Sequence, residues 1–401
     1  MDTAAQFDKV DILFAGAEGG EARRRTDAAL ALLDAGHTRS EIIEQTGVVT
    51  GAAGIELAVE RGEVFVVMGL SGSGKSTILR ALNGLNRVSR GRVLVRHKDD
   101  LVDLTAPEPR ILRAVRNQAM SMVFQHFALL PWRSVRRNVE LGLELRGMKP
   151  EAMRAVVDEW LDVVGLLPWA DKYADELSGG MQQRVGLARA LVTDPGILLM
   201  DEPFSALDPL IRNKLQDELL SLQNRLHKTI IFVTHDLDEA LKIGNRIAIM
   251  KDGRVVQIGN PEDIVLRPAD DYVADFVKHM NPLTALRAVS LMTPVGALPM
   301  HDGRHEFHDS ETYVLALHAD GRLDRLACAS DGAGGTAELL AEAAPMTASP
   351  RATLKDVLEL RQQTRRPVLI CEDGKVLGLC GVNEILDALT NAGRAAIAET
   401  A

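Results

Sequence analysis

One short glycine-rich run limits what this chain can fold into more than any other feature of its sequence. Residues 69–76 read Gly-Leu-Ser-Gly-Ser-Gly-Lys-Ser and match the pattern G-x-x-x-x-G-K-[ST]. The residues before the run, 64–68, are apolar and of strand length, and residues 77–82 have the pattern of a helix. A strand, loop and helix in this order leave backbone N–H groups around one concave space at a helix N-terminus. The run therefore predicts a binding site for phosphate.

Two side chains at the end of the run suit a nucleoside triphosphate. Lys75 is expected to reach the β- and γ-phosphates, and the Ser76 hydroxyl is expected to hold Mg²⁺. ATP and Mg²⁺ are therefore the predicted cofactors. The residues predicted to line the phosphates are Gly69, Leu70, Ser71, Gly72, Ser73, Gly74, Lys75, Ser76 and Thr77.

A second apolar run, residues 197–200, ends in the two carboxylates Asp201 and Glu202. A buried strand that ends in Asp places a carboxylate beside the phosphate loop, where it can help to hold Mg²⁺. Glu202 would point to the other side of the strand and could polarise an attacking water. Without the phosphate loop, a solvated strand end would be the better interpretation of Asp-Glu.

Between these two runs, residues 177–191 begin Leu-Ser-Gly-Gly-Met-Gln-Gln-Arg and resemble the signature sequence of ABC transporter ATPases. Three shorter matches follow the order of that family. Gln125 in Val-Phe-Gln-His-Phe resembles the Q-loop, Ser205-Ala-Leu-Asp208 resembles the D-loop, and His235 in Val-Thr-His-Asp resembles the switch histidine. A single Gln or His would be an ordinary surface or core residue, whereas the ordered set favours the family.

The resemblance covers about residues 50–280 and implies a head-to-tail homodimer that encloses two ATP molecules. In such a dimer the signature of one chain completes the ATP site of the other. The resemblance assigns catalysis to Glu202, His235, Gln125 and Lys75. It assigns binding of the metal to Ser76, Gln125 and Asp201. Beyond the loop, it assigns binding of ATP to Gln125, Ser178, Gly179, Gly180, Asp201, Asp208 and His235.

The order of patterns along the chain predicts its fold class. Between about residues 55 and 264, apolar runs alternate with amphipathic stretches, which predicts an α/β domain with a largely parallel sheet. The resemblance makes this a P-loop NTPase cassette with a RecA-like α/β core, and helical periodicity over about 126–190 predicts a helical subdomain within it. The predicted divisions are a helical N-terminal extension over 1–50, the cassette over 51–281, a linker over 282–310 and an α+β tail over 311–395.

The tail holds two stretches that look like unequal copies of one small α/β unit. The clearer copy, within 353–390, predicts a capped helix, a strand, a tight turn, a strand and a helix. Residues 313–326 repeat it weakly. These stretches resemble a degenerate pair of cystathionine-β-synthase-type (CBS) units. A regulatory role with an adenine nucleotide as ligand and a dimerising or stabilising role both stay open.

Composition limits the partners and the location of the chain. The net charge of -10 makes a large nucleic-acid surface unexpected, because such surfaces depend on clustered Lys and Arg. No stretch approaches the roughly 20 apolar residues that cross a bilayer, and the N-terminus lacks the layout of a signal peptide. The chain would therefore need a partner to reach a membrane, and the resemblance to ABC transporter ATPases implies a peripheral place at the cytoplasmic face of the cell (inner) membrane, on a separate integral membrane permease.

Many members of the family stack an aromatic ring on adenine from just before the first glycine-rich strand. Residues 46–54 offer no aromatic side chain. Val48 or Val49 is therefore expected to pack against the base.

Several stretches resemble the ATP-binding subunits of quaternary-amine importers, among them residues 42–47, 127–133 and 211–219. Residues 272–282 look most like the choline importer, next to the glycine betaine/proline one. This implies import of choline, glycine betaine or proline betaine, with a periplasmic or lipid-anchored binding protein acting indirectly. Residues 127–133 are expected to dock the permease. The alternatives are an importer for a different small solute and a soluble ABC ATPase with no role in transport.

Overall fold

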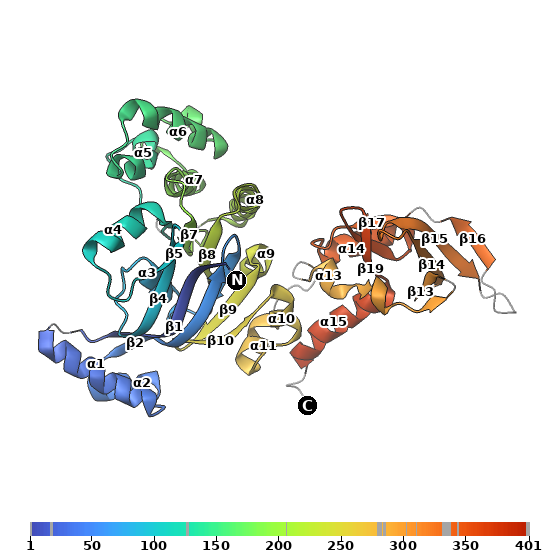
Figure 1. Cartoon of the computed structure of the whole chain (residues 1–401), viewed down its shortest axis with the longest axis horizontal. Helices are drawn as coiled ribbons and strands as arrows, with labels where there is room; N and C mark the ends of the chain where they lie inside the picture. The colour runs from blue at the N-terminus through green and yellow to red at the C-terminus, as the bar shows by residue number, and fades with distance from the viewer. Residues whose placement is uncertain are drawn as a thin grey trace. The chain divides into compact units, whose positions relative to one another are not determined.

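The computed structural model forms two compact units, Met1–Asn260 and Pro261–Ala401 (Figure 1). No helix in the part of the chain that it describes is long and apolar enough to span a membrane. The described residues are 2–16, 19–125, 128–205, 207–278, 283, 286–301, 303–309, 311–330, 338–342 and 345–397.

The core of the first unit is a six-stranded sheet in the order β10-β9-β3-β8-β7-β6. Its strands run parallel except β10, which pairs antiparallel with β9 at one edge. Every residue of β3, β7 and β8 is buried, as expected for central strands that are covered on both faces. The strands are β3 Val64–Met68, β6 Met120–Val123, β7 Ile197–Asp201, β8 Thr229–Thr234, β9 Arg246–Lys251 and β10 Arg254–Gly259.

A second, antiparallel sheet in the first unit has the order β2-β1-β4-β5. Helix α3, Lys75–Leu82, lies between the two sheets, because Ile78 and Leu79 share one buried cluster with Phe7 of β1 and Phe65 of β3. Each such side chain stabilises the fold by roughly 1.5–3 kcal/mol when it is fully buried. The strands are β1 Thr3–Phe14, β2 Val49–Glu60, β4 Arg90–His97 and β5 Asp100–Asp103.

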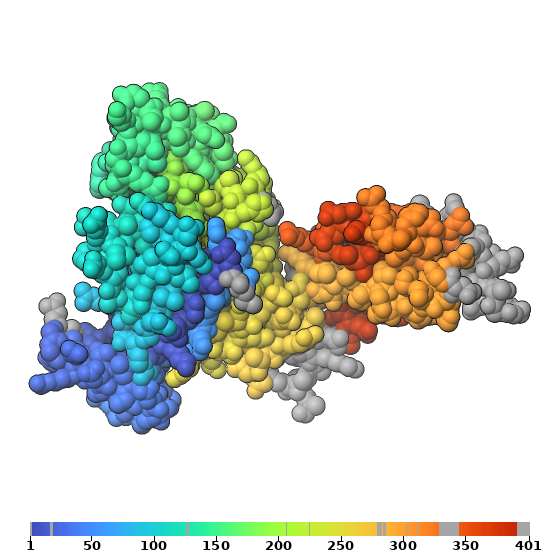
Figure 2. Space-filling model, in the orientation of Figure 1, coloured from blue at the N-terminus to red at the C-terminus, as the bar shows by residue number. Residues whose placement is uncertain are grey.

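Helices α5, α6 and α7 pack on one another and form the green lobe of the first unit (Figures 1 and 2). Met153, Val157 and Leu161 of α6, which recur at four-residue steps, are buried in their shared core with Val139 and Val185. This lobe lies in the region where the helical periodicity was noted. The helices of the first unit that follow α3 are α4 Pro109–Gln118, α5 Val135–Leu145, α6 Pro150–Val163, α7 Gly179–Leu191, α8 Pro209–Leu226 and α9 Leu237–Ile243, with short 3₁₀ turns at Leu167–Trp169 and Ala174–Glu176.

The first 50 residues do not form the predicted helical extension. Thr3–Phe14 is a strand that pairs with β2 on one side and β4 on the other, and only α1, Gly19–Asp34, and α2, Arg39–Thr46, are helical. The prediction was wrong for the strand because its buried residues follow no strict alternation and its partners lie far along the chain. The chain therefore enters the first unit as a strand, and the two helices are an insertion between β1 and β2.

The second unit contains two sheets. One has the order β11-β19-β18-β17, and the other is antiparallel in the order β12-β13-β14-β15-β16. The strands are β11 Thr293–Pro294, β12 Met300–His301, β13 Arg304–His308, β14 Thr312–Leu317, β15 Leu323–Ser330, β16 Glu338–Glu342, β17 Met346–Ala348, β18 Val368–Glu372 and β19 Lys375–Cys380. The helices are α10 Pro261–Leu266, α11 Asp271–Val277, α13 Ala288–Leu291, α14 Leu354–Thr364 and α15 Val382–Ile397, with a 3₁₀ turn at Val295–Ala297.

The structure moves two predicted boundaries. The compact division follows Asn260 rather than residue 281, because α10 and α11 contact α15. Most of the predicted linker over 282–310 is folded: β11 pairs with β19, and Leu298 and Phe307 are buried in the core of the second unit. Pro294 and Pro299 lie in and beside the very short strands β11 and β12.

The two predicted copies in the tail do not share one order of elements. The second has the order β17-α14-β18-β19-α15, close to the prediction. In the first, the described residues between 300 and 342 form antiparallel strands, so the weak sequence echo reflects two strands and a turn rather than a repeated unit.

Candidate phosphate-binding and catalytic site

The loop between β3 and α3 has a backbone that requires glycine at two positions. Gly69 has φ 149° and Gly74 has φ 101°. A Cβ atom would lie 2.3 Å from the Met250 carbonyl oxygen at Gly69, and 2.3 Å from the Gly51 carbonyl oxygen at Gly74. Because those contacts are with backbone, no side-chain rearrangement can relieve them. The glycines of the sequence pattern therefore hold the loop close to neighbouring strands.

Lys75, the first residue of α3, is buried, with 5% of its side chain exposed. Its Nζ donates to the carbonyl oxygens of Gly69 at 2.9 Å and Leu70 at 3.1 Å, and lies 3.7 Å from Glu202 Oε1. Burial lowers the pKa of Lys75, and the nearby carboxylates of Glu202 and Asp201 oppose that change. The ammonium group is thus held inside the loop, next to a carboxylate at the end of β7.

Ser76 and Asp201 form a pair of oxygen atoms beside the loop. The Ser76 hydroxyl donates to Asp201 Oδ1 at 2.7 Å, and Asp201 Oδ2 lies 3.1 Å from Arg80 Nη2. Ser73 Oγ is buried and has no hydrogen-bond partner among the described residues. A hydroxyl and a carboxylate are ligands that Mg²⁺ accepts, and an orphaned hydroxyl inside the loop fits a phosphate oxygen.

One chain of contacts links Glu202, His235, Gln125 and Ser205. The His235 Nδ1 and Glu202 Oε2 atoms lie 3.1 Å apart. Gln125 Nε2 lies 3.4 Å from Ser205 Oγ, which donates to the Glu202 carbonyl oxygen at 3.0 Å. Glu202 itself has φ 44°, which non-glycine residues adopt at a cost and which is frequent at functional sites. The ends of β6, β7 and β8 thus bring these side chains together around Glu202.

The signature residues and Asp208 lie at other helix ends. Ser178 caps α7 and Asp208 caps α8, each accepting a backbone N–H with its side chain. A Cβ atom on Gly180 would lie 2.7 Å from Ile211 Cγ2, so α7 approaches α8 closely there. In the described part of the chain, no hydrogen bond or ion pair joins Ser178 or Asp208 to residues 69–77. These residues do not complete the site within one chain.

The structure removes Val48 from the two residues expected to pack against adenine. Val48 is fully buried with the inserted helices, so it cannot pack on a base, and Val49 is exposed. Phe14, at the end of β1, is 40% exposed. A Cβ atom on Gly51 would lie 2.5 Å from Phe14 Cε2 and 2.9 Å from Thr77 Cγ2, so the ring lies beside the start of α3. Phe14 was not among the expected site residues, because residues 1–50 were expected to be helical.

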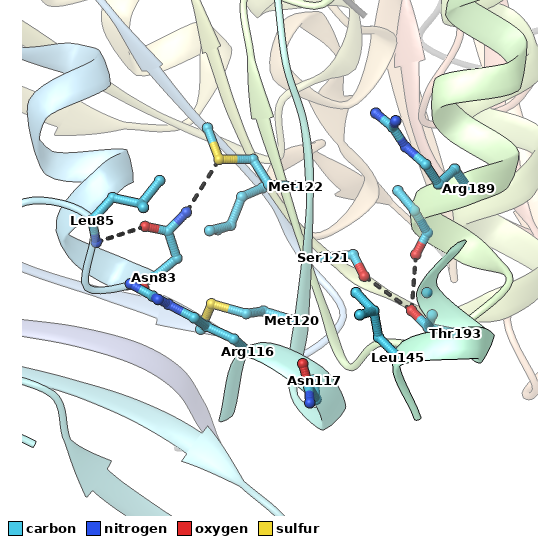
Figure 3. Close-up of a pocket in the computed structure, with 13 residues that line it drawn as sticks. Asn83, Leu85, Arg116, Asn117, Met120, Ser121, Met122, Leu145, Arg189 and Thr193 are labelled. Atoms are coloured by element: carbon cyan, nitrogen blue, oxygen red, sulfur yellow. Dashed lines mark hydrogen bonds between the residues drawn. The ribbon is translucent and has the colours of Figure 1, made fainter. Parts of the chain in front are cut away.

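A cleft of about 310 Å³ lies where α3, α4 and β6 meet α5 and α7. Figure 3 shows Asn83 and Arg116 on one side of it, with Ser121 and Thr193 on the other. Arg189 also lines the cleft, and its Nη1 donates to the Ala128 carbonyl oxygen at 2.6 Å. In the segment that follows Gln125, Phe127 lies outside the described residues, as does Ala206 of the D-loop match.

The sequence model of the ABC transporter family matches residues 52–205, which hold the phosphate loop, the signature and the two carboxylates. A model for an AAA domain matches the shorter stretch 172–241. Over 269 residues, the chain is 49% identical to a glycine betaine/carnitine transport ATP-binding protein of Listeria monocytogenes, and the match covers 67% of each protein. The chain belongs to the ABC transporter family. As a member, this ABC ATPase binds and hydrolyses ATP.

Other relatives of this ABC ATPase agree. It is 49% identical to the glycine betaine transport ATP-binding protein of Bacillus subtilis, over 67% of this chain and 63% of that protein. It is 48% identical to the glycine betaine/proline betaine ATP-binding protein of Escherichia coli, over 67% of each. The match thus spans about two thirds of these relatives. Among solved structures, a dimer of the bacterial cassette MJ0796 is 29% identical with a TM-score of 0.52, over 64% of this chain and 98% of that one.

Proposed function

We propose that this ABC ATPase powers import of a quaternary amine, choline or glycine betaine and its relatives, through a separate membrane permease. The meeting of Lys75, Ser76, Asp201 and Glu202 at the ends of β3 and β7 supports the ATPase part. The amine part rests on identities of 48–49% with ATP-binding proteins named for glycine betaine transport. Relatives named for sulfate/thiosulfate and Fe(3+) import are 40% and 42% identical, which favours the amine branch.

Each side chain of the site has a proposed role. Phosphoryl transfer to water needs positioning and charge neutralisation more than covalent chemistry. Lys75 binds the β- and γ-phosphates, and Glu202 polarises the attacking water. His235, 3.1 Å from Glu202, orients that carboxylate and contacts the γ-phosphate. Gln125 is linked to the site through Ser205, whose hydroxyl donates to the Glu202 carbonyl oxygen.

The proposed metal is Mg²⁺, held by Ser76 and Asp201, with Gln125 as a further predicted ligand. The ion neutralises charge on the phosphates when it is bound. The 2.7 Å hydrogen bond between Ser76 and Asp201 supports this assignment because it places two hard oxygen ligands together.

A second copy of the chain is proposed to complete each ATP site with Ser178, Gly179, Gly180 and Asp208. Ser178 caps the N-terminus of α7, an end that favours an anion. Because no hydrogen bond or ion pair in the described part of the chain joins Ser178 or Asp208 to residues 69–77, a head-to-tail homodimer gives them a role. The likeness to the dimeric cassette supports the same arrangement.

Phe14 is the proposed stacking partner of adenine. It is a half-exposed aromatic ring next to Thr77, on the side of the loop where α3 begins. An aromatic face contributes roughly 1–3 kcal/mol when a base stacks on it.

The permease is proposed to dock in the cleft of Figure 3 and along residues 128–133. Leu85 and Leu145 are exposed apolar side chains on the cleft, and Trp132 is 72% exposed in the neighbouring segment. Arg189 joins the two regions through its bond to Ala128. The ATPase would then lie at the cytoplasmic face of the cell membrane, and a periplasmic or lipid-anchored binding protein would contact only the permease.

For the tail we propose a stabilising or dimerising role rather than adenine-nucleotide binding at α15. The side chain of Asp309 is completely buried at the start of that helix and accepts the Val382 N–H at 2.6 Å. A nucleotide phosphate at this helix end would compete with a carboxylate of the chain itself.

The test is uptake of labelled choline and glycine betaine by cells that hold the permease, the binding protein and either this chain or its Glu202→Gln variant. Uptake of one amine should fall at least about 100-fold with the variant, because general base catalysis contributes about 10²–10⁴-fold. The variant complex should still assemble. Uptake of both amines that does not depend on the chain would contradict the amine assignment and leave the ATPase assignment intact.

A further inference from the structure

The two helices inserted between β1 and β2 form a hairpin that lies on the first unit as a distinct lobe, drawn in blue in Figure 2. Ala29 and Leu33 of α1 and Ile42 of α2 share a buried cluster with Leu13 of β1 and Ala53 of β2. The hairpin therefore packs on the same two strands that place Phe14 and Gly51 beside the phosphate loop.

The turn that joins α1 to α2 is fixed to the sheet on its α1 side. Asp34, at the end of α1, makes a two-pronged ion pair with Arg90 of β4, with both distances 2.7 Å. Arg90 also bonds to the buried Asp11 at 2.6 Å. This contact anchors the hairpin to the sheet and involves no residue of the nucleotide site.

The α2 side of the same turn contacts the phosphate loop itself. Arg39 is the first residue of α2, directly after Thr38, whose capping box with Glu41 fixes the start of the helix. Arg39 Nη1 donates to the Gly72 carbonyl oxygen at 3.0 Å, and Nη2 donates to the Thr50 carbonyl oxygen. One guanidinium thus joins the tip of the loop to the strand residue before Gly51.

This bridge acts on a part of the loop that has open space beside it. A Cβ atom on Gly72 would find no heavy atom within 4 Å, so a side chain added there would meet nothing. The guanidinium reaches two carbonyl groups in fixed geometry. Because Arg39 bonds to a carbonyl group, it acts on phosphate through the loop rather than by contact.

We propose that Arg39 is a positioning residue that holds the phosphate loop in its binding shape and couples the inserted hairpin to nucleotide affinity. The proposal rests on the ATPase function proposed above. Coupling is reciprocal, so nucleotide binding should in turn hold α2 more firmly. Any force that moves the hairpin would then change the affinity for ATP.

The test is steady-state ATP hydrolysis by the full chain and its variants. Arg39→Ala should raise KM for MgATP about tenfold and leave kcat within about twofold. The tenfold change corresponds to the usual contribution of one charge-assisted hydrogen bond. Arg39→Lys should raise KM about threefold, because one ammonium group cannot serve both carbonyls in the same geometry. Arg24→Ala, which removes an exposed charge from the same hairpin, should leave both constants unchanged.

Hydrogen exchange supplies a readout that a purely structural role would not move. Amides of residues 39–46 should become more protected when MgADP binds to the wild-type chain, and this gain should be absent in Arg39→Ala. An active wild-type chain whose KM is unchanged in both Arg39 variants would overturn the proposal. If Arg39→Ala fails to fold, Arg39→Lys with an unchanged KM and unchanged exchange would overturn it. A wild-type chain with no hydrolysis would instead contradict the ATPase function.

Discussion

Two helix N-termini in this chain have opposite surroundings. Helix α3 of the first unit starts after Gly74, and α15 of the second unit starts after Gly381. At α3, the buried Ser73 hydroxyl has no partner among the described residues. At α15, Asp309 accepts the Val382 N–H at 2.6 Å and pairs with Arg361 at 2.7 Å. A Cβ atom on Gly381 would lie 2.5 Å from Asp309 Oδ1.

The difference shows that the same local feature, a helix N-terminus, has two different roles in this chain. A helix N-terminus attracts an anion through its free N–H groups and its dipole. The second unit supplies that anion from its own chain, so the helix end contributes to folding. The first unit leaves its helix end to a ligand and adds a buried lysine, so the same kind of helix end serves binding.

Among the substitutions at these two helix ends, that of Gly74 should have the largest effect, and the effect is on affinity for MgATP. Gly74→Ala forces a Cβ atom to 2.3 Å from the Gly51 carbonyl oxygen at φ 101°, so the loop must leave its binding shape. Affinity for MgATP should fall at least about 100-fold, as expected when a binding group is misplaced by about 1 Å. Titration calorimetry on the full chain measures it. Gly72→Ala is the matched control: it meets no atom within 4 Å and should cost only about fivefold through its positive φ of 79°.

Removal of Asp309 should act on the other helix end. Asp309→Ala leaves Arg361 as a buried cation without its partner, which costs about 3–5 kcal/mol of unfolding free energy in the second unit. Urea denaturation of the full chain measures this change, while ATP hydrolysis per folded chain should stay unchanged. Glu359→Ala breaks the exposed pair with Lys355 and should cost less than about 1 kcal/mol. Equal losses in the two variants would show that Asp309 is not a structural anion.

The smallest change in stability should come from substitution of Lys75, and this change should be a gain rather than a loss. Burial lowers the pKa of Lys75, so the folded chain binds that proton less tightly than the unfolded chain. The charged lysine therefore reduces stability in full below its folded pKa, and this cost falls away as pH rises from the folded pKa to the higher unfolded pKa. Lys75→Met should stabilise the chain by about 1 kcal/mol at pH 7 while hydrolysis is lost. The gain should shrink at alkaline pH. A variant less stable than wild type in thermal unfolding at pH 7 would contradict this.

Most of the candidate site could be predicted because it is local in sequence. Residues 69–76 and the pair Asp201-Glu202 each follow an apolar strand, and carboxyl ends of parallel strands meet at one edge of a sheet. The order of motifs supplied the family. The six-stranded sheet was predictable for the same reason, because its buried strands are continuous apolar runs.

The parts that were missed depend on distant partners. Strand β1 and Phe14 acquire their places from β2 and β4, and Arg39 meets Gly72 only in the folded chain. In the tail, β11 is two residues long and exists only because it pairs with β19. Asp309 and Arg361 are 52 positions apart by their numbers, and no local pattern marks either as half of a buried pair.

The position of β1 inside its sheet has a consequence for how this chain is made. β1 is synthesised before β2 and β4 but lies between them, so its two edges find partners only after residues 49–60 and 90–97 have been added. Closing these long loops is slow compared with local helix formation. The hairpin of α1 and α2 can therefore form early on the ribosome, while the strand before it waits, and the ring of Phe14 reaches its place only when the sheet closes.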